Sequence, residues 1–433
     1  MEEKYPKFSV IIPLKDRGEY IGATLRTCMA QDYPNFEIIV SDDHSEDNTV
    51  EVVRKLAQID SRIKLYAHQE HLGMRDNFEF ALNQVKEGYV IALGGDDGLV
   101  PGCIMRMYEI IRATGRQLLT WSYPTFFYPT PDSMGKNLLL VGRNKRGVPK
   151  IIKSKDFLRK ISESFYYQID ECPMLYIKGV ASIELVNRVK SRTSDGCFYY
   201  CPTPDGFSGV VLAGEVEDFV YTDEPLSIGG TTIKSQGQNY RRTDKKSREE
   251  AQQFFNDNIR RTMHVELASQ PYSPLQTLMT ADYLLTARDL PGWPAAGSYE
   301  VSFENLIKKS FLLMANSHYE DEVLIRELKI LKRIAEYHNL TDLFDDLFHN
   351  MKRSFVFAPE IYGNAITHSI RFEGSELGIN NIYDAANAVP FVSRFFTQSL
   401  IKYSWSIIKN NFRIVLRSFN KTRKDFPKVQ NWN

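Results

Sequence analysis

The chain has few cysteines, no excess of charge of either sign and no long apolar run. Its five cysteines are scattered, and the one close pair, in CFYYC, lacks a second pair to complete a four-ligand zinc site. Lysine plus arginine and aspartate plus glutamate both number 54, which argues against a general nucleic-acid binder. No run approaches the ~18 uncharged apolar residues of a membrane span. We therefore expect reduced thiols, no nucleic-acid partner and no membrane-spanning helix.

Two further absences narrow the class of protein. No GxGxxG motif follows an apolar run, which argues against a dehydrogenase. The N-terminal residues, MEEKYPKFSVII, lack the basic start and long apolar core of a signal peptide. We therefore expect the protein to be cytoplasmic.

The N-terminal part of the chain alternates strand and helix patterns. Short apolar runs typical of buried strands are separated by segments whose apolar residues recur at helical spacing. The strand segments are FSVIIP, FEIIV, RIKLYAH and YVIAL. This order predicts an α/β fold with a Rossmann-like, doubly wound and mostly parallel sheet.

Two acidic clusters, SDDHS and GGDDG, directly follow the second and fourth of these strands. Ligands of doubly wound sheets bind beyond the carboxyl ends of the strands. We therefore expect both clusters at one edge of the sheet, where the glycines leave room for a ligand.

At 433 residues the chain is too long for one typical core, so two domains are the first expectation. From about residue 248 to 351 the apolar spacing becomes helical, as in EDEVLIRELKILKRIAEYH. We predict an α/β domain over 1–240, a mostly α-helical C-terminal domain over 241–390 and a basic helical tail over 391–433.

The tail has an apolar stripe at steps of three or four from Ile401 to Phe419, with basic residues on much of the remaining surface. A basic amphipathic helix rich in aromatic residues suits an anionic membrane surface. Packing on the same chain or on a second copy explains the pattern equally well. Peripheral contact with the inner face of the cell membrane and a homo-oligomer therefore both stay open.

The segment from Phe8 to Thr49 combines an apolar strand ending in Pro13, a helix ending near Gln31, and FEIIV leading into DDxSxDxT. Together with YVIALGGDDGLVPG, it resembles the opening of glycosyltransferase family 2. The resemblance is close to about Gly115 and looser near Asp205. It implies a GT-A fold and transfer of a sugar from a nucleotide-diphosphate donor with inversion.

In this family the segment that GGDDG resembles binds a divalent metal, Mn²⁺ or Mg²⁺. The resemblance places Asp96 on the metal-contacting position of the family's Asp-x-Asp pattern, with Asp97 after it and Gly95 beside the donor. Gly94 stands where the first aspartate is expected, so this chain departs from the pattern. A hard cation held by one or two carboxylates neutralises a departing diphosphate well. An acidic turn without a metal is the alternative.

The resemblance implies further donor contacts at the same edge. Asp43 is expected to accept the N–H of a uracil-like base, with Pro13 and Leu14 packed beside that base. Arg75, in HLGMRDN, is expected to meet the diphosphate, and Lys234 is a weaker candidate for a phosphate contact. A helix cap is the alternative role for the SDDHS cluster, and a plain surface position is the alternative for Arg75.

An inverting transfer needs a general base for the acceptor hydroxyl. The family places a carboxylate for this at the start of a helix, and TPDGFSGVVLAGE matches that pattern with Asp205. A helix N-cap without chemistry is the alternative for Asp205, and Asp195, in an SDG turn, is the second candidate base. We expect the acids of GEVED, from Glu215 to Asp218, to form a solvated turn.

The sequence thus predicts an inverting, metal-dependent glycosyltransferase with a glycan or lipid-linked acceptor, acting in surface polysaccharide or glycoconjugate synthesis. Two other classes stay open. A nucleotidyltransferase would carry a glycine-rich, basic loop after the first strand, where this chain has PLKDRGEY with one glycine. A non-catalytic protein of the same fold, which binds a nucleotide-sugar or acts as a scaffold, is kept open by Gly94.

Overall fold

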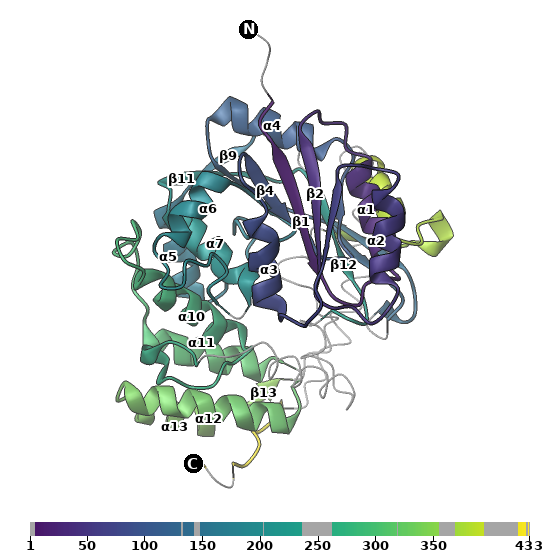
Figure 1. The fold of residues 1–433 in the computed structure, drawn as a ribbon. Helices are drawn as coiled ribbons and strands as arrows, with labels where there is room; N and C mark the ends of the chain where they lie inside the picture. Colours follow the sequence, from purple (N-terminus) through teal and green to yellow (C-terminus); the bar gives the residue numbers. More distant parts are fainter. Residues whose placement is uncertain are drawn as a thin grey trace.

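The computed structural model describes residues 5–130, 133–142, 148–201, 203–235, 262–317, 319–354, 369–393, 423–429 and 432. An eight-stranded sheet with strand order β3-β2-β1-β4-β10-β6-β11-β9 forms the centre of the N-terminal part (Figure 1). All its strands run in one direction except β10 and β9. The strands are β1 Phe8–Leu14, β2 Phe36–Asp42, β3 Ile63–Ala67, β4 Tyr89–Ala92, β6 Leu118–Trp121, β9 Lys150–Lys153, β10 Gly179–Ser182 and β11 Asp218–Thr222.

The first strand shows why its sequence is a continuous apolar run. Every residue of β1 is buried, with Val10 and Ile12 in the core on one face of the sheet and Ile11 in the core on the other. Successive side chains of a strand point to opposite faces, and both faces here are covered by helices. The predicted doubly wound, mostly parallel sheet is therefore confirmed.

The two faces are covered by different helices. On one side lie α1 Ile21–Met29, α2 Thr49–Ala57 and α4 Cys103–Thr114. On the other side lie α3 Met74–Asn83, α5 Ser154–Ser164, α6 Ile183–Lys190 and α7 Pro204–Gly214.

A second sheet, not predicted from the sequence, has the order β14-β8-β7-β12-β5. Its strands are β5 Gly98–Leu99, β7 Thr125–Phe127, β8 Leu138–Gly142, β12 Ser227–Thr231 and β14 Ser369–Glu373. Residues 382–393 are helical, and Ile382 and Val389 belong to the same core as β1. The segment 369–393 therefore packs on the α/β part, although it follows the helical region in sequence.

The helical region lies below the sheet in Figure 1 and has its own core. It comprises α10 Gln276–Arg288, α11 Phe303–Ala315, α12 Asp321–Tyr337 and α13 Thr341–Asn350, with the short 3₁₀ turn η2 Val265–Leu267. Elsewhere lie η4 Ser375–Leu377 and the pair β13 Arg353–Ser354 with β15 Arg423–Lys424. The predicted helical character of this region is confirmed.

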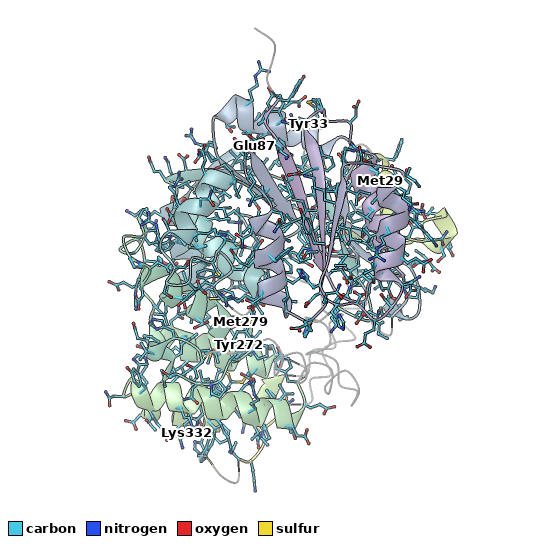
Figure 2. All side chains as sticks on the ribbon, in the orientation of Figure 1. Met29, Tyr33, Glu87, Tyr272, Met279 and Lys332 are labelled. Atoms are coloured by element: carbon cyan, nitrogen blue, oxygen red, sulfur yellow. The ribbon has the colours of Figure 1, made fainter. Side chains whose placement is uncertain are left out.

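The helical region and the α/β part meet at α10, which packs against α7 and α5. Met279 of α10 contacts the cores of both parts, and Tyr272 lies at the same junction (Figure 2). Of the helices in the described ranges, none has both the length and the apolar composition to cross a membrane. The predicted amphipathic stripe from Ile401 to Phe419 lies outside the described residues.

Candidate active site

The carboxyl ends of β1, β2 and β4 form the edge at which both acidic clusters lie. Leu14 pairs with Asp42 at the end of the β1–β2 ladder, and the Asp43 amide donates to the Leu14 carbonyl at 2.8 Å. On the other side of β1, the Leu93 amide donates to the Ile11 carbonyl at 3.0 Å, just before the GGDD turn. The parallel strand order thus brings SDDHS and GGDDG to one edge, as predicted.

Asp97 is a buried carboxylate that closes the turn. Its Oδ2 accepts from the Gly94 amide at 2.7 Å, and its Oδ1 accepts from the Gly230 amide of β12 at 2.8 Å. Burial first, and then the Asp96 carboxylate, raise the pKa of Asp97 to about 7, while these amides and the Tyr176 hydroxyl act in the opposite direction. Asp97 is only 1% exposed, and both its oxygens already accept hydrogen bonds. Its predicted role as a metal ligand stays a prediction, and the geometry favours Asp96.

Asp96 has a more available oxygen. Its Oδ2 accepts from the Thr232 hydroxyl at 3.1 Å, whereas Oδ1 has no hydrogen-bond partner among the described residues. The backbone of Gly230 passes so close that a Cβ there would lie 1.9 Å from the Asp96 carbonyl oxygen, so β12 needs glycine at this point. A divalent cation fits this arrangement with a single protein carboxylate, provided that phosphate oxygens and water complete its ligands.

Arg17 and Lys234 place positive charge beside the turn. The Arg17 guanidinium donates to the Lys234 carbonyl at 3.1 Å, and Lys234 Nζ donates to the Asp16 carbonyl at 2.7 Å. The stem of Arg17 lies over Gly95, where a Cβ would be 2.8 Å from Arg17 Cγ. Arg17 was not among the residues predicted from the sequence. Its position shortly after the first strand, at the edge where ligands bind, is the signal that could have identified it.

Asp43 holds the loop that leads into α3. Its carboxylate accepts from the amides of Leu72 at 2.6 Å and Gly73 at 3.1 Å, and lies 2.9 Å from Nδ1 of His71. Pro13 and Leu14, at the end of β1, are buried beside it. The structure therefore places the three predicted base-contacting residues together, and the contact of Asp43 with a base stays a prediction.

Asp42 and Ser45 close a turn within SDDHS rather than capping α2. The Asp42 carboxylate accepts from the Ser45 amide at 3.0 Å and from its hydroxyl at 2.5 Å. The residue before α2 is Asn48, and the Thr49 amide donates to Asp47 at 2.9 Å. Asp47, one residue before the N-cap Asn48, therefore accepts the first amide of α2.

Arg75 is bonded to the loop before α7. Its Nε donates to the Tyr199 carbonyl at 2.7 Å, and its Nη2 is paired with Asp195. This pairing joins the start of α3 to the loop before α7 and occupies the second candidate base, Asp195. A contact between Arg75 and a donor stays a prediction, and it would compete with Asp195.

Asp205 lies in the first turn of α7, partly exposed. The N-cap of this helix is Thr203, so Asp205 is not the cap. Burial raises the pKa of Asp205, and only its own amide and that of Gly206 lower it. Aromatic rings pack against the neighbouring Gly206: a Cβ there would lie 2.3 Å from the Tyr283 ring and 2.7 Å from the Tyr167 ring. A partly buried carboxylate that has no cationic partner in the described part of the chain has a raised affinity for protons, which suits a general base.

The acids after α7 do not form the solvated turn that we expected. Glu215 is paired with Arg192 at 2.5 Å, and Asp218 with Arg116 at 2.5 Å, and both carboxylates are buried. Glu217 alone is exposed. The expectation failed because both arginines are distant in sequence, so the pairing is set by the tertiary fold.

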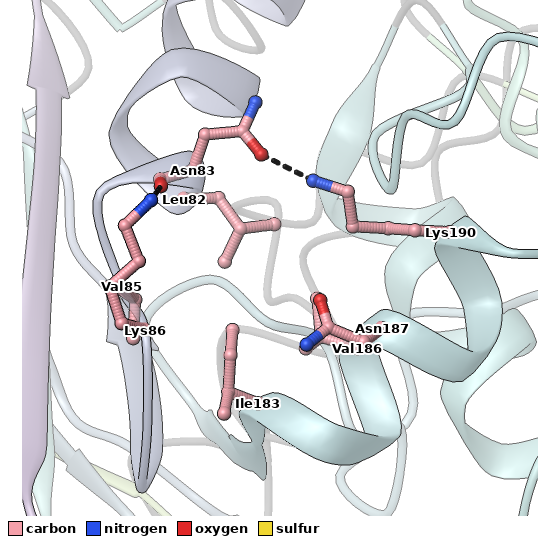
Figure 3. A pocket seen from close by; sticks show the side chains of 8 residues that line it. All are labelled: Leu82, Asn83, Val85, Lys86, Ile183, Val186, Asn187 and Lys190. Atoms are coloured by element: carbon pink, nitrogen blue, oxygen red, sulfur yellow. Dashed lines mark hydrogen bonds between the residues drawn. The ribbon is translucent and has the colours of Figure 1, made fainter.

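A possible metal cluster and a small pocket do not belong to the candidate active site. In the described part of the chain, His264, Glu266 and Asp289 could hold a metal ion, but Arg288 is paired with both acids. A pocket of about 180 Å³ lies between the end of α3 and α6, where Lys190 is bonded to Asn83 (Figure 3). It is at the opposite end of α3 from the candidate active site.

A doubly wound sheet with acids at the carboxyl ends of its strands, followed by an acid at the start of a helix, defines a GT-A domain. Residues 9–165 match the model of glycosyl transferase family 2, so this part of the chain belongs to that family.

Curated relatives support the assignment over the N-terminal part. A GalNAc(5)-diNAcBac-PP-undecaprenol β-1,3-glucosyltransferase of Campylobacter jejuni is 35% identical over 105 residues, which are 24% of this chain and 34% of that protein. Glycosyltransferase GlyA of Streptococcus pneumoniae is 28% identical over 120 residues, 28% of this chain and 17% of that protein. The chain therefore spans about a third or less of the length of these relatives.

Solved structures with a related arrangement share little sequence. TarS 1–349 of S. aureus with UDP-GlcNAc matches with a TM-score of 0.43 and 14% identity, over 82% of this chain and 95% of that one. The mannosyltransferase PcManGT of Pyrobaculum calidifontis with GDP-Man and Mn²⁺ matches with a TM-score of 0.37 and 14% identity, over 79% and 85%.

Proposed function

We propose that the protein is an inverting glycosyltransferase that moves a sugar from a nucleotide-diphosphate donor to an acceptor hydroxyl. The observation that carries the proposal is that the acidic turn after β4 lies at the same strand edge as Asp43, in the part of the chain that matches the family model. Asp97, Asp96 and Asp205 all contribute, after burial itself, to raising the pKa of Tyr176. This shared electrostatic influence supports placing the acidic turn and the start of α7 in one site.

In this proposal Asp205 is the general base. The acceptor hydroxyl loses its proton to the Asp205 carboxylate as its oxygen forms a bond to the anomeric carbon. The bond from that carbon to the diphosphate oxygen breaks, and the nucleoside diphosphate departs with the electron pair. Attack opposite the leaving group inverts the anomeric centre.

The other residues of the edge bind and orient the donor. Asp43, Pro13 and Leu14 lie where the nucleoside is expected, and Gly95 and Gly230 allow close approach of the backbone. Asp96 would hold a divalent cation, Mn²⁺ or Mg²⁺, which when bound supplies positive charge to the diphosphate. Arg17 and Lys234 add positive charge on the other side of the turn.

The acceptor and the cellular location are inferred from the name of a relative and from the C-terminal tail. The C. jejuni relative is named for a lipid-linked substrate. We infer a glycan or lipid-linked acceptor in surface polysaccharide or glycoconjugate synthesis, with peripheral contact at the inner face of the membrane through residues 391–433. The division into 1–240, 241–390 and 391–433 stays part of this proposal.

Calorimetry of UDP-GlcNAc and GDP-mannose, with and without Mn²⁺, tests the donor site. Metal-dependent binding of one donor to the wild type, lost in Asp96→Ala and retained in the exposed control Glu217→Gln, is the expected result. Absence of binding to the wild type under every condition would count against the enzyme and favour a scaffold. Binding without sugar transfer to any acceptor would favour a non-catalytic member of the fold.

A further inference from the structure

The space beside Gly94 is the most unusual feature of the site. A Cβ built on Gly94 would lie 2.8 Å from Asp97 Oδ2, 2.8 Å from the Tyr176 hydroxyl and 3.1 Å from Asp96 Oδ1. Three oxygens from two segments of the chain therefore surround the position that a side chain at 94 would occupy. Ordinary van der Waals contact needs a greater separation than this, so the arrangement depends on glycine.

Tyr176 reaches this position from a segment distant in sequence, just before β10. Its hydroxyl lies close enough to the Asp97 carboxylate to lower the pKa of that group, and its ring packs against Phe78 with centroids 6.0 Å apart. Tyr176 lies beyond residue 165, where the match to the family model ends. The N-terminal motifs therefore do not predict that Tyr176 lies in the site.

The backbone next to Tyr176 is held in an uncommon conformation. Ile177 has φ of 59°, which is sterically unfavourable for a β-branched residue. Its amide donates to the Ala92 carbonyl at 2.8 Å, and its carbonyl accepts from the Ser227 hydroxyl at 2.6 Å. Hydrogen bonds to β4 and β12 thus fix the segment. Backbone strain like that at Ile177 is concentrated at functional sites.

We infer that the Tyr176 hydroxyl takes the place of an acidic side chain at position 94 and positions the Asp96–Asp97 turn for the nucleotide-diphosphate donor. Gly94 is then a requirement of the site and not a lost ligand. A neutral hydroxyl beside Asp97 adds no negative charge, whereas a third carboxylate would repel the two already there. The inference rests on the proposed function for its ligand, but its geometry can be tested without one.

The test is a double-mutant cycle of wild type, Gly94→Ala, Tyr176→Phe and the double variant, measured by thermal unfolding. Gly94→Ala is expected to lower the unfolding midpoint of the wild type more than that of Tyr176→Phe, because one of the close contacts is then gone. If the changes in unfolding midpoint of the two single variants add up to that of the double variant, the placement of Tyr176 beside Gly94 is wrong.

Donor binding is measured on the same proteins by calorimetry with UDP-GlcNAc and GDP-mannose in the presence of Mn²⁺. Tyr176→Phe keeps the ring and loses the hydroxyl, and is expected to weaken binding about tenfold, the upper range for the loss of one neutral polar contact. Tyr221→Phe, which loses a bond to Ser122 elsewhere in the sheet, is the matched control. Wild-type affinity in Tyr176→Phe, with loss only in Tyr176→Leu, would show a packing role and overturn the inference.

Gly94→Asp, which completes the acidic pattern of the family, is expected to bind the donor more weakly than the wild type. Equal or tighter binding would overturn the inference. If the wild type binds neither donor but the unfolding cycle is coupled, the proposed function fails while the placement of Tyr176 stands. If the cycle is additive and the wild type binds, the placement fails and the proposed function stands.

Discussion

The carboxylates of Asp97, in the turn after β4, and of Asp205, at the start of α7, have different surroundings. Asp97 accepts from two backbone amides that belong to different segments, so it is fixed and has no free oxygen. Asp205 precedes a glycine that packs against aromatic rings, it has no cationic partner among the described residues, and only amides of its own helix turn lower its pKa. The difference indicates that Asp97 holds the backbone in place, and it agrees with the proposed role of Asp205 as the group that takes up a proton.

The largest expected effect is on turnover. Asp205→Asn is expected to lower the rate of sugar transfer about 10²–10⁴-fold, because that is the contribution of a general base. Donor binding should persist, since Asp205 does not hold the donor in the proposal. Initial rates with a lipid-linked acceptor measure the effect, with Glu217→Gln as the control. An unaffected rate in Asp205→Asn together with a lost rate in Asp195→Asn would move the base to Asp195.

The next effect is on stability at the acidic turn. Asp97→Ala leaves the buried amides of Gly94 and Gly230 without their acceptor, so we expect a loss of about 2–4 kcal/mol in the free energy of unfolding. Asp97→Asn retains one acceptor oxygen and should lose less. Urea unfolding measures both variants. Equal losses in the two variants would mean that the amides do not depend on this side chain.

A smaller effect follows from the raised pKa of Asp205. The folded state binds this proton more tightly than the unfolded state, so the contribution of Asp205 to stability is complete at low pH. It is lost as the pH rises from the ordinary aspartate range through the raised pKa. Above that window Asp205→Asn should be more stable than the wild type, and below it the two should agree. Transfer activity should rise over the same window, because the base must be deprotonated.

This pH dependence is measured by urea unfolding of both proteins from about pH 3, below the ordinary aspartate pKa, to about pH 8. A difference in stability that stays constant over this range would contradict a raised pKa at Asp205.

The smallest expected effect concerns the contact between α7 and the helical region. The Thr203 hydroxyl is bonded to the hydroxyls of Tyr272, at 2.7 Å, and Tyr283. Thr203→Val removes these bonds and should cost about 1 kcal/mol, whereas Thr203→Ser keeps the hydroxyl and should cost less. If kcat falls in Thr203→Val while the donor affinity is unchanged, the helical region helps to position Asp205. Unchanged kcat would limit the contact to stability.

Local patterns were enough to predict the strands and the edge of the sheet. The runs at β1, β2 and β4 are mostly apolar because both faces of the sheet are covered, and a polar or glycine residue follows within two positions of each strand's end. Parallel order then requires that both acidic clusters lie at the same edge. The acid at Asp205 was found because it follows a proline and precedes an apolar helical run.

The contacts that decide the role of each residue were not predictable in this way. Arg75 meets Asp195, 120 residues further along the chain, and the Gly230 amide meets Asp97, 133 residues away. No periodicity within a segment encodes such pairs. The packing of residues 369–393 on the α/β part was not predictable from local patterns either. It depends on which part of the sheet and its helices the other elements leave uncovered.

By itself, the sequence determined the α/β sheet, the acidic edge and the helical region, because periodicity and strand ends are properties of neighbouring residues. Only the tertiary structure decided that Asp97 is fixed by amides, that Asp43 holds the loop before α3, and that Tyr176 lies where a side chain at position 94 would be. Each of these depends on a hydrogen bond or a close approach between segments far apart in the chain, and that distance is set by packing.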